Sequence, residues 1–390
     1  MSTEDAIIGA TLEGLRRAAE EVEQIAAIAE TLQRSLLDER LPDIVGLRLA
    51  ARYQAGSADA QVGGDWYDVI PLRGGQAGIA IGDVVGHGID AATRMAHLRS
   101  ALRAYALERL RPSVVLERMN EFARELAPGV MATLLYGIVD PDERQLTIAS
   151  AGHPPPLVLS SSGDADYADG RTGSPLGVRR LPTYEDSIVA LAPESLVLLY
   201  TDGLIERPDA PLDAGLEWLR QFAGDFAGRP NELCEAVLAA CFRSARPRDD
   251  VALLAVSLEP LLQEGIEIDL PAEPESLASM RRAVGRWLRT LGAGDAETYE
   301  ILVACGEACS NAVAHAYPPG EASYQVSTRR LDSGIEVRVR DYGKWRPPRA
   351  GSRGRGLDLM GQLVDDVEID RGSAGTIVTI RRKLGTGSGT

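Results

Sequence analysis

The sequence predicts an α+β protein of several domains, in which an amphipathic N-terminal helix precedes two units that each combine a sheet with helices. Its 390 residues exceed the usual length of one domain. Residues 4–38 carry apolar side chains at helical spacing, and the chain beyond Pro42 alternates short strand-like runs with helical patterns. This alternation is interrupted once, at Glu259–Gly265. We therefore expect a helical segment at residues 1–41, one domain at 42–259 and another at 264–385.

The N-terminal helix is predicted by apolar positions whose steps alternate between three and four residues, with one interruption. They are Ile8, Leu12, Leu15, Ala19, Val22, Ile25, Ala29, Leu32 and Leu36. So narrow an apolar seam needs a partner, and we expect two copies of the chain to form a homodimer here as a parallel coiled coil. The alternative is a helix that packs back onto the domain that follows. Pro42 ends the helix, because proline lacks the backbone N–H and disfavours helix before it.

Composition and charge narrow the class of protein. The chain has 57 acidic and 41 basic residues and a formal net charge of −16, which disfavours nucleic acid and anionic membrane surfaces as partners. No apolar run reaches the length of a membrane span, and the acidic N-terminus lacks a signal-peptide pattern. The cysteines, Cys234, Cys241, Cys305 and Cys309, have the spacing of small apolar helix residues, which favours a reducing compartment. We expect a cytoplasmic protein.

In the first domain the order of strand and helix patterns fits two sheets flanked by pairs of helices. The predicted strands are Leu47–Tyr53, Val69–Leu72, Ile79–Ile81, Ala132–Val139, Gln145–Ser150, Leu157–Leu159, Ser187–Leu191, Leu196–Tyr200 and Val251–Val256. The predicted helices are Ile89–Leu107, Pro112–Leu126, Leu212–Phe226 and Glu232–Phe242. Ser113 is a candidate cap of its helix, and Ser160–Asp169 reads as a polar loop.

Aspartates stand at the ends of several of these strands. Asp65 and Asp83 follow glycines, Asp202 follows the strand that ends at Tyr200, and Asp249 precedes the strand at Val251–Val256. Glycine lets a carboxylate approach a small ion closely, although aspartates at glycine turns are more often simple turn caps. A set of carboxylates without clustered cysteine or histidine suits Mg²⁺ or Mn²⁺ rather than zinc. Two such ions would activate a bridging water and hold a phosphoryl group.

Six motifs follow one another along residues 42–258: GGDWYD, IGDVVGHG, ASAGHPPPL, SPLG, YTDGLIE and RDDVALLAV. Together they resemble the SpoIIE-type branch of the metal-dependent serine/threonine protein phosphatases. The resemblance implies an α-β-β-α sandwich with two Mn²⁺ or Mg²⁺ ions in its site. The metal ligands that it implies are Asp65, Asp83 with the backbone carbonyl of Val84, Asp202 and Asp249. Asp250 is the alternative to its neighbour Asp249.

The histidines do not have the spacing of a zinc site. His87 lies beside Asp83, where it would assist phosphate binding or hold the loop, and we favour the loop. For His97 and His153 we expect structural hydrogen bonds rather than metal ligation.

The second domain opens with a strand and two helices and continues with strand pairs around one more helix. The predicted strands are Ile266–Leu270, Tyr324–Arg330, Ile335–Arg340, Asp366–Asp370 and Gly375–Arg381, and the predicted helices are Pro274–Leu291, Ala296–Ala316 and Leu357–Val364. Glu307 and Asn311 lie four residues apart and so share one helix face. A glycine-rich loop at Gly351–Leu357 precedes the last helix, a weaker phosphate-binding signal than a full P-loop.

The motifs GEACSNAVAHAY, DYG, GRGLDLM and GTIVTI cover nearly all of residues 266–384 and resemble the GHKL ATPases, specifically the RsbW-type anti-sigma factor serine kinases. The resemblance implies an α/β sandwich that binds ATP with Mg²⁺. It implies that Asn311 ligates the Mg²⁺, Glu307 acts as general base on a substrate serine, and Asp341 binds the adenine amino group. It further implies that Gly343 makes room for the adenine ring, Gly354 and Gly356 let the loop backbone wrap the phosphates, and Thr376 contributes near the adenine. Trp345 departs from the family, which has glycine there.

These resemblances together predict a phosphatase and a serine kinase in one chain, both acting on an anti-sigma factor antagonist in partner-switching regulation. A sigma factor is a further candidate partner. We hypothesise that the helix at 4–38 or ATP occupancy biases one activity against the other. Two alternatives stand beside this reading: a phosphatase regulated by a non-catalytic ATP sensor, which Trp345 motivates, and a binding protein that sequesters a sigma factor.

Overall fold

The computed structural model describes residues 41–56, 63–86, 88–126, 129–206, 211–226, 229–242, 249–259, 264–315, 322–343, 355–372 and 375–385. The predicted N-terminal helix, His87, Trp345 and Gly354 lie outside these ranges. The chain divides into two compact units, Met1–Glu259 and Pro260–Thr390.

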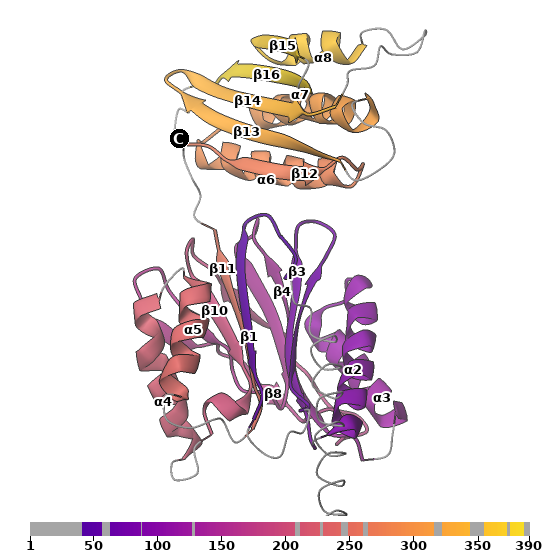
Figure 1. The fold of residues 1–390 in the computed structure, drawn as a ribbon, viewed down its shortest axis with the longest axis vertical. Coiled ribbons are helices and arrows are strands. Elements are labelled where there is room, and N and C mark those ends of the chain that lie inside the picture. The colour runs from indigo at the N-terminus through magenta and orange to yellow at the C-terminus, as the bar shows by residue number, and fades with distance from the viewer. Residues whose placement is uncertain are drawn as a thin grey trace, which may run out of the picture. The chain divides into compact units, whose positions relative to one another are not determined.

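The first unit contains two sheets that pack face to face (Figure 1). One sheet has the order β1-β11-β10-β6-β7, with β1 at Leu47–Gln54, β11 at Val251–Leu258, β10 at Leu196–Tyr200, β6 at Leu157–Leu159 and β7 at Ala165–Tyr167. The other has the order β2-β3-β4-β5-β8, with β2 at Trp66–Pro71, β3 at Ala77–Val84, β4 at Ala132–Asp140, β5 at Gln145–Ala151 and β8 at Thr172–Gly173. A further strand, β9 at Ser187–Ala190, pairs with β5.

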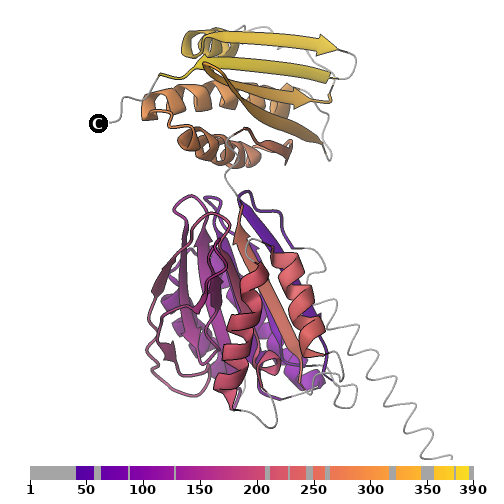
Figure 2. The same ribbon diagram turned by 90° about the vertical axis from the view of Figure 1, so that its left-hand side faces the viewer.

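A pair of helices covers the outer face of each sheet, which confirms the predicted α-β-β-α order. Helices α2 (Ile89–Leu107) and α3 (Pro112–Leu126) contact β2 to β5. Helices α4 (Leu212–Ala223) and α5 (Pro230–Cys241) contact β7, β1 and β11, and Figure 2 shows them lying across that sheet. Strands β10 and β11 are buried along their whole length, because one face meets the other sheet and the opposite face meets helices. Their sequences are correspondingly continuous apolar runs.

Two local predictions in this unit are wrong. Ser113 lies inside α3 rather than capping it, and its backbone N–H donates to Asp186 Oδ1 at 2.7 Å. The cap therefore comes from a residue distant in sequence. The predicted polar loop at Ser160–Asp169 contains strand β7, which forms an antiparallel pair with β6. The Tyr167 hydroxyl fixes this strand by donating to the Leu216 carbonyl of α4 at 2.7 Å.

A buried ion-pair cluster ties β2 to α2. Asp68 is 1% exposed and accepts from Arg103 Nε at 2.7 Å and Arg103 Nη2 at 2.7 Å. Arg99 Nε lies 3.2 Å from the same carboxylate, and the Arg99 side chain is also largely buried. Burial of a carboxylate is favourable only when it is paired and hydrogen bonded, and Asp68 meets both conditions.

The second unit is a single antiparallel sheet with helices packed against it. The sheet has the order β12-β13-β14-β16-β15, with β12 at Glu267–Pro271, β13 at Ser323–Leu331, β14 at Gly334–Asp341, β16 at Gly375–Lys383 and β15 at Asp366–Gly372. Helices α6 (Ser276–Thr290), α7 (Asp295–His315) and α8 (Arg355–Leu363) build the core with it. Figure 1 shows these helices packed along the sheet. Every helix and strand predicted for this unit is present, with ends shifted by up to two residues.

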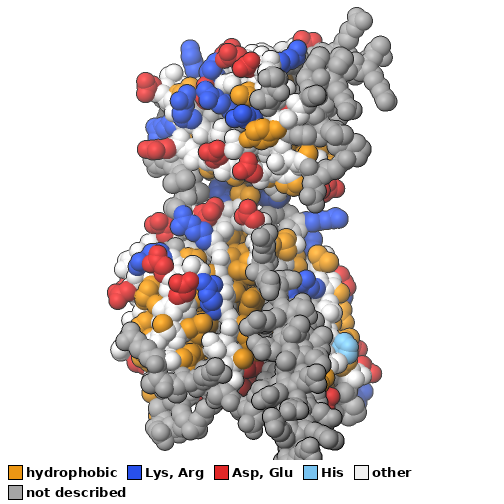
Figure 3. Space-filling model, in the orientation of Figure 1, with side chains coloured by type: hydrophobic (Ala, Val, Ile, Leu, Met, Phe, Trp, Pro, Cys, Tyr) orange, Lys and Arg blue, Asp and Glu red, His pale blue; other side chains and the backbone are white. Residues whose placement is uncertain are grey.

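The described surface has mixed charge. On the face shown in Figure 3, acidic and basic side chains are interspersed over both units. The four cysteines are free, and Cys234, Cys305 and Cys309 are buried, as expected of core residues. Within the described ranges, none of the helices combines the length and apolar character needed to cross a membrane.

We predict that Asp68→Asn destabilises the first unit by about 3–5 kcal/mol, because the substitution removes the carboxylate that two buried or half-buried guanidinium groups face. Chemical unfolding followed by circular dichroism measures this loss. The control is Glu108→Gln, which removes one partner of the exposed Arg118–Glu108 pair and should change stability by at most about 1 kcal/mol. Equal losses in the two variants would contradict a structural role for the Asp68 cluster.

Candidate functional site

The turn before β2 holds Asp65 against the end of β3. Gly64 packs directly on the Val84 peptide: a Cβ atom added at Gly64 would lie 2.2 Å from the Val84 carbonyl oxygen. The Val84 N–H donates to the Gly64 carbonyl at 3.2 Å. Only glycine permits so close an approach of two backbones. Asp65, the next residue, is 3% exposed and lies beside Asp83.

The buried Asp65 and the half-buried Asp83 form a pair of carboxyl groups. Their side chains lie next to each other, and the Thr201 side chain lies next to Asp65, where it acts to lower the pKa of that residue. Burial and the neighbouring charge of Asp83 raise the pKa of Asp65 well above its usual range. Burial also raises the pKa of Asp83, and the charges of Asp249 and Asp250 add to that effect. Two strand ends of one sheet thus place two acids in a region that disfavours negative charge.

The other sheet contributes Asp202, which follows β10 and begins a short 3₁₀ turn at Asp202–Leu204. Burial raises the pKa of Asp202 to about 6, and the charges of Asp83, Glu206 and Asp249 act in the same direction. Glu206 was not singled out from the sequence. Its backbone N–H donates to the Asp202 carbonyl at 2.8 Å, so one turn of chain brings its carboxylate near the same site. The four-residue spacing in YTDGLIE is the signal that identifies it.

The adjacent residues Asp249 and Asp250 have different surroundings. Asp250 is 5% exposed, and its Oδ1 accepts from the Gly56 N–H at 2.8 Å. It also packs on Gly63, where an added Cβ atom would lie 1.1 Å from Asp250 Oδ2. Asp249 is exposed, and its Oδ1 accepts from the Asp250 N–H at 2.9 Å. Asp250 therefore holds the chain that leads to Asp65, whereas the Asp249 carboxylate is accessible beside Asp83 and Asp202.

His153 joins the two sheets next to these carboxylates. Its Nε2 lies 3.1 Å from the Tyr200 carbonyl on β10, and its Nδ1 lies 2.8 Å from the Thr133 hydroxyl on β4. Thr133 is the register partner of Asp83, and Tyr200 precedes Thr201 and Asp202. Burial lowers the pKa of His153 to about 3, so the ring is neutral: Nε2 donates and Nδ1 accepts. The predicted structural role of His153 is confirmed.

The carboxylates have the donor chemistry that a hard divalent cation requires. Asp65 Oδ2 and Asp250 Oδ2 are buried without a hydrogen-bond partner, a state that costs free energy unless a cation or water satisfies the oxygen. Among the described residues no three histidine, cysteine or acidic side chains surround one point closely enough to hold a metal alone. A cation here would thus take part of its coordination from backbone oxygen or water, as Mg²⁺ commonly does.

In the second unit the structure brings Asp341, Gly343 and Thr376 together. Asp341 ends β14 and is the register partner of Thr376 on β16. Its Oδ1 accepts from the Gly343 N–H at 3.1 Å and from the Thr376 N–H at 3.3 Å. Burial raises the pKa of Asp341, although these hydrogen bonds act in the opposite direction. Asp341 is 8% exposed, and its carboxylate is fixed in one orientation by the turn after β14 and by β16.

Glu307 and Asn311 lie on consecutive turns of α7, which packs against β14 and β16. Glu307 is half-buried and Asn311 is exposed. These two residues and Asp341 belong to the same unit. Among the described residues, no hydrogen bond joins Glu307 or Asn311 to Asp341. Gly356 falls in the first turn of α8, one residue inside the helix rather than in the predicted loop. Gly354 lies outside the described residues.

Comparisons with known proteins agree with both motif sets. Residues 73–259 match the family described as Stage II sporulation protein E (SpoIIE), and residues 270–382 match the histidine kinase-like ATPase domain. Phosphoserine phosphatase RsbU of Bacillus subtilis is 28% identical over 209 residues, which cover 51% of this chain and 60% of that protein. Serine-protein kinase RsbW of Bacillus velezensis is 31% identical over 130 residues, which cover 29% of this chain and 81% of that protein.

One solved structure resembles the chain across both units. The RsbU and RsbW domains of Rv1364c from Mycobacterium tuberculosis are 31% identical, with a TM-score of 0.54 over 88% of this chain and 94% of that one. The chain spans less than two thirds of two curated phosphatase relatives from Bacillus subtilis, 60% of RsbU and 38% of RsbP. The predicted resemblances to SpoIIE-type phosphatases and RsbW-type kinases are confirmed. The chain belongs to the family of proteins that join an RsbU-type phosphatase domain to an RsbW-type kinase domain.

Proposed function

We propose that the first unit hydrolyses the phosphoserine of a phosphorylated anti-sigma factor antagonist, and that the second unit binds ATP with Mg²⁺ and phosphorylates the same protein. The observation that carries this proposal is the meeting of Asp65, Asp83 and Asp202 from two sheets at one edge of the sandwich, where the charge of Asp83 raises the pKa of both Asp65 and Asp202. Bound cations would offset the repulsion between these closely spaced carboxylates.

Asp65, Asp83, the Val84 carbonyl, Asp202 and Asp249 would hold two ions, Mn²⁺ or Mg²⁺. Bound there, the ions lower the pKa of a water and position the phosphoryl group. The protein's own contribution is to fix the oxygens. Thr201 lies beside Asp65 and favours its charged form, Gly64 keeps the Val84 peptide next to that turn, and Asp250 holds the approaching chain.

Glu206 adds a carboxylate at the edge of this set. It lies close enough to Asp83 and Asp202 to raise the pKa of each, yet it is exposed. We propose that Glu206 orients water rather than ligating a metal ion directly, because its exposed carboxylate is in contact with solvent.

In the second unit Asp341 would accept a hydrogen bond from the adenine amino group. The oxygen available for it is Oδ2, because Oδ1 accepts from the two backbone N–H groups. Gly343 and Thr376 hold Asp341 in place, and Gly343 leaves room for the ring. Asn311 would ligate the Mg²⁺ of ATP, and Glu307, one turn earlier, would take the proton of the substrate serine. The backbone at Gly354 and Gly356 would contact the phosphates.

The activities for which these relatives are named, phosphoserine phosphatase and serine-protein kinase, support opposed reactions on one substrate. We further propose that the protein is cytoplasmic, pairs with a second copy through residues 1–41 and has a sigma factor as a further partner. The N-terminal segment or the ATP state would then select which activity dominates.

Asp202→Asn should lower Mn²⁺-dependent hydrolysis of an aryl phosphate by at least about 100-fold, since it removes one charged ligand and several kcal/mol of transition-state stabilisation. The comparison is made with and without ATP, so that any effect of the nucleotide reports coupling between the units. Asp213→Asn, an exposed acid in the first turn of α4, is the control and should retain full activity. Equal hydrolysis by the wild type and Asp202→Asn would contradict the role of Asp202, whereas no Mn²⁺-dependent hydrolysis by the wild type would favour the protein that sequesters a sigma factor.

Asp202 should also make the metal-free protein less stable as pH rises. Its pKa is about 6 in the folded state and near 4 in the unfolded chain, so ionisation between these values opposes folding by on the order of 2 kcal/mol. With EDTA at pH 7.5, Asp202→Asn should therefore melt above the wild type, and the difference should shrink as pH falls to 4. Mn²⁺ should stabilise the wild type more than the variant. A wild type that melts higher in EDTA at pH 7.5 would contradict this.

Glu307→Gln should abolish transfer of phosphate from ATP to a purified antagonist, by at least about 100-fold, while the Kd for ATP changes by less than about threefold. Asp295→Asn, an exposed acid at the start of the same helix, serves as the control. If the wild type binds ATP without phosphorylating the antagonist, the second unit is an ATP sensor. If Glu307→Gln still phosphorylates the antagonist, another group is the base.

A further inference from the structure

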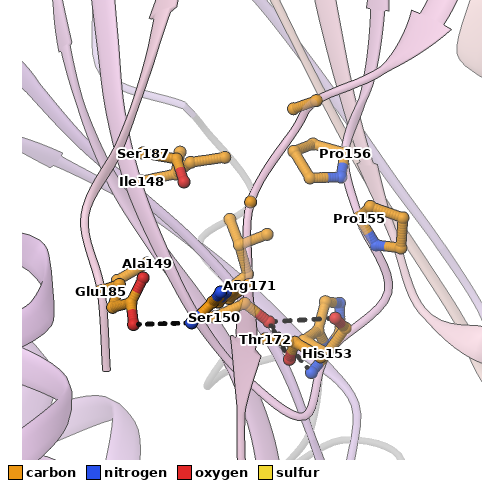
Figure 4. Close-up of a pocket in the computed structure, with 13 residues that line it drawn as sticks. Ile148, Ala149, Ser150, His153, Pro155, Pro156, Arg171, Thr172, Glu185 and Ser187 are labelled. Atoms are coloured by element: carbon orange, nitrogen blue, oxygen red, sulfur yellow. Dashed lines mark hydrogen bonds and ion pairs between the residues drawn. The ribbon is translucent and has the colours of Figure 1, made fainter. Parts of the chain in front are cut away.

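A cavity of about 180 Å³ opens between the two sheets of the first unit. Figure 4 shows Pro155 and Pro156 on one side of it, facing Ile148 and Ser187 on the other. Ser150, Thr172 and His153 lie together at one end. None of these residues belongs to the carboxylate site. His153 lies between that site and the cavity.

The cavity lies at the same end of the sandwich as the carboxylates. Strand β3 ends at Val84, β4 begins at Ala132 and β5 ends at Ala151, so antiparallel pairing brings these three ends together. Asp83 pairs with Thr133, and the next strand along is β5. Two strand spacings, about 10 Å, therefore separate Asp83 from the cavity end of β5. An extended peptide covers that distance in about three residues.

The polar groups of the cavity already have partners. The Ser150 hydroxyl donates to the His153 carbonyl at 3.0 Å, accepts from the His153 N–H at 3.2 Å and lies 2.9 Å from the Thr172 hydroxyl. The Thr172 hydroxyl also accepts from the Gly152 N–H at 3.0 Å. An occupant thus needs no polar atom to satisfy the lining. Apart from Ser187 and the charged side chains of Arg171 and Glu185, the remaining walls, which include Leu135, Ile148 and Ala168, are apolar.

The size of the cavity fits one side chain. A cavity of about 150 Å³ lined by apolar groups accommodates a benzene ring, whereas pockets for whole drug-sized molecules exceed about 300 Å³. At the mouth, Arg171 Nη1 lies 3.6 Å from Glu185 Oε1, and both side chains are mostly exposed. Because an exposed pair is held weakly, the rim can open to admit a chain.

We propose that this cavity is a docking site for one apolar side chain of the phosphoprotein substrate, located about three residues from its phosphoserine. The proposal rests on the phosphatase activity proposed above. It assigns recognition of the substrate's sequence to Pro155, Pro156, Ile148 and Ala168, while the carboxylates act on the phosphoryl group alone. An aryl phosphate, which lacks the flanking chain, does not use the cavity.

The test uses the full chain with Mn²⁺ and short synthetic phosphoserine peptides that have alanine at all flanking positions except one. A single leucine is moved step by step away from the phosphoserine on either side. Leucine at about three residues on one side should raise kcat/KM by at least about tenfold over the all-alanine peptide, mainly through a lower KM. If leucine raises kcat/KM at none of these positions, the proposal is overturned.

Filling the cavity should remove this preference without affecting the chemistry. In Ala168→Phe the half-buried alanine of the lining is replaced by a ring that occupies the space. The leucine advantage should disappear, while aryl phosphate hydrolysis stays within about twofold of the wild type. Ala165→Phe, at an equally half-buried alanine of β7 outside the lining, is the matched control and should retain the advantage.

A second variant, Glu185→Trp, covers the mouth from an exposed position and does not alter the core. It keeps the test valid if Ala168→Phe fails to fold, which a loss of aryl phosphate hydrolysis would reveal. Survival of the leucine advantage in a folded Ala168→Phe or in Glu185→Trp would overturn the docking site. Absence of aryl phosphate hydrolysis in the wild type would instead count against the phosphatase itself.

Discussion

Repulsion between buried carboxylates is the constraint on which the first unit depends. Asp65, Asp83 and Asp202 come from three separate segments, and burial raises the pKa of each. Folding alone does not favour such an arrangement, because desolvated like charges oppose it. The surrounding structure therefore has to hold the acids in place. It does so with a glycine turn packed on a peptide, a threonine hydroxyl and the continuous apolar cores of β10 and β11.

Two polar links join layers near the site. The neutral ring of His153 connects β4 to β10 by a hydrogen bond at each nitrogen. Asp68 connects β2 to α2 through two arginines. Each link lies close to a strand end that carries a site residue, so the separation of the sheets at that edge is defined by hydrogen-bond lengths as well as by packing. The same histidine forms the wall between the carboxylates and the inter-sheet cavity, which relates substrate docking to the site.

In the second unit, hydrogen bonds hold a single buried carboxylate in place. A single buried carboxylate, Asp341, is oriented by backbone N–H groups from Gly343 and Thr376. No second acid lies beside it in the described structure, so the hydrogen bonds need only offset its burial. One acid poised to accept a hydrogen bond suits recognition of a neutral adenine, whereas a group of repelling acids suits cations. The different grouping of the carboxylates thus accounts for the different ligands that we propose for the two units.

The sequence by itself determined the elements and most of the residues involved. Apolar periodicity predicted α2 and α3 at their observed ends, and glycine-aspartate pairs at strand ends pointed to Asp65, Asp83 and Asp202. Only the tertiary structure decided the relations between distant residues. The cap of α3 comes from Asp186, and β7 forms because it pairs with β6. Asp250 differs from Asp249 in being buried, because it packs on Gly63. The inter-sheet cavity is likewise a product of assembly, whereas one local turn of chain brings Glu206 to the site. Propensity and spacing act within a segment, whereas hydrogen bonds and burial between segments exist only once the sheets have come together.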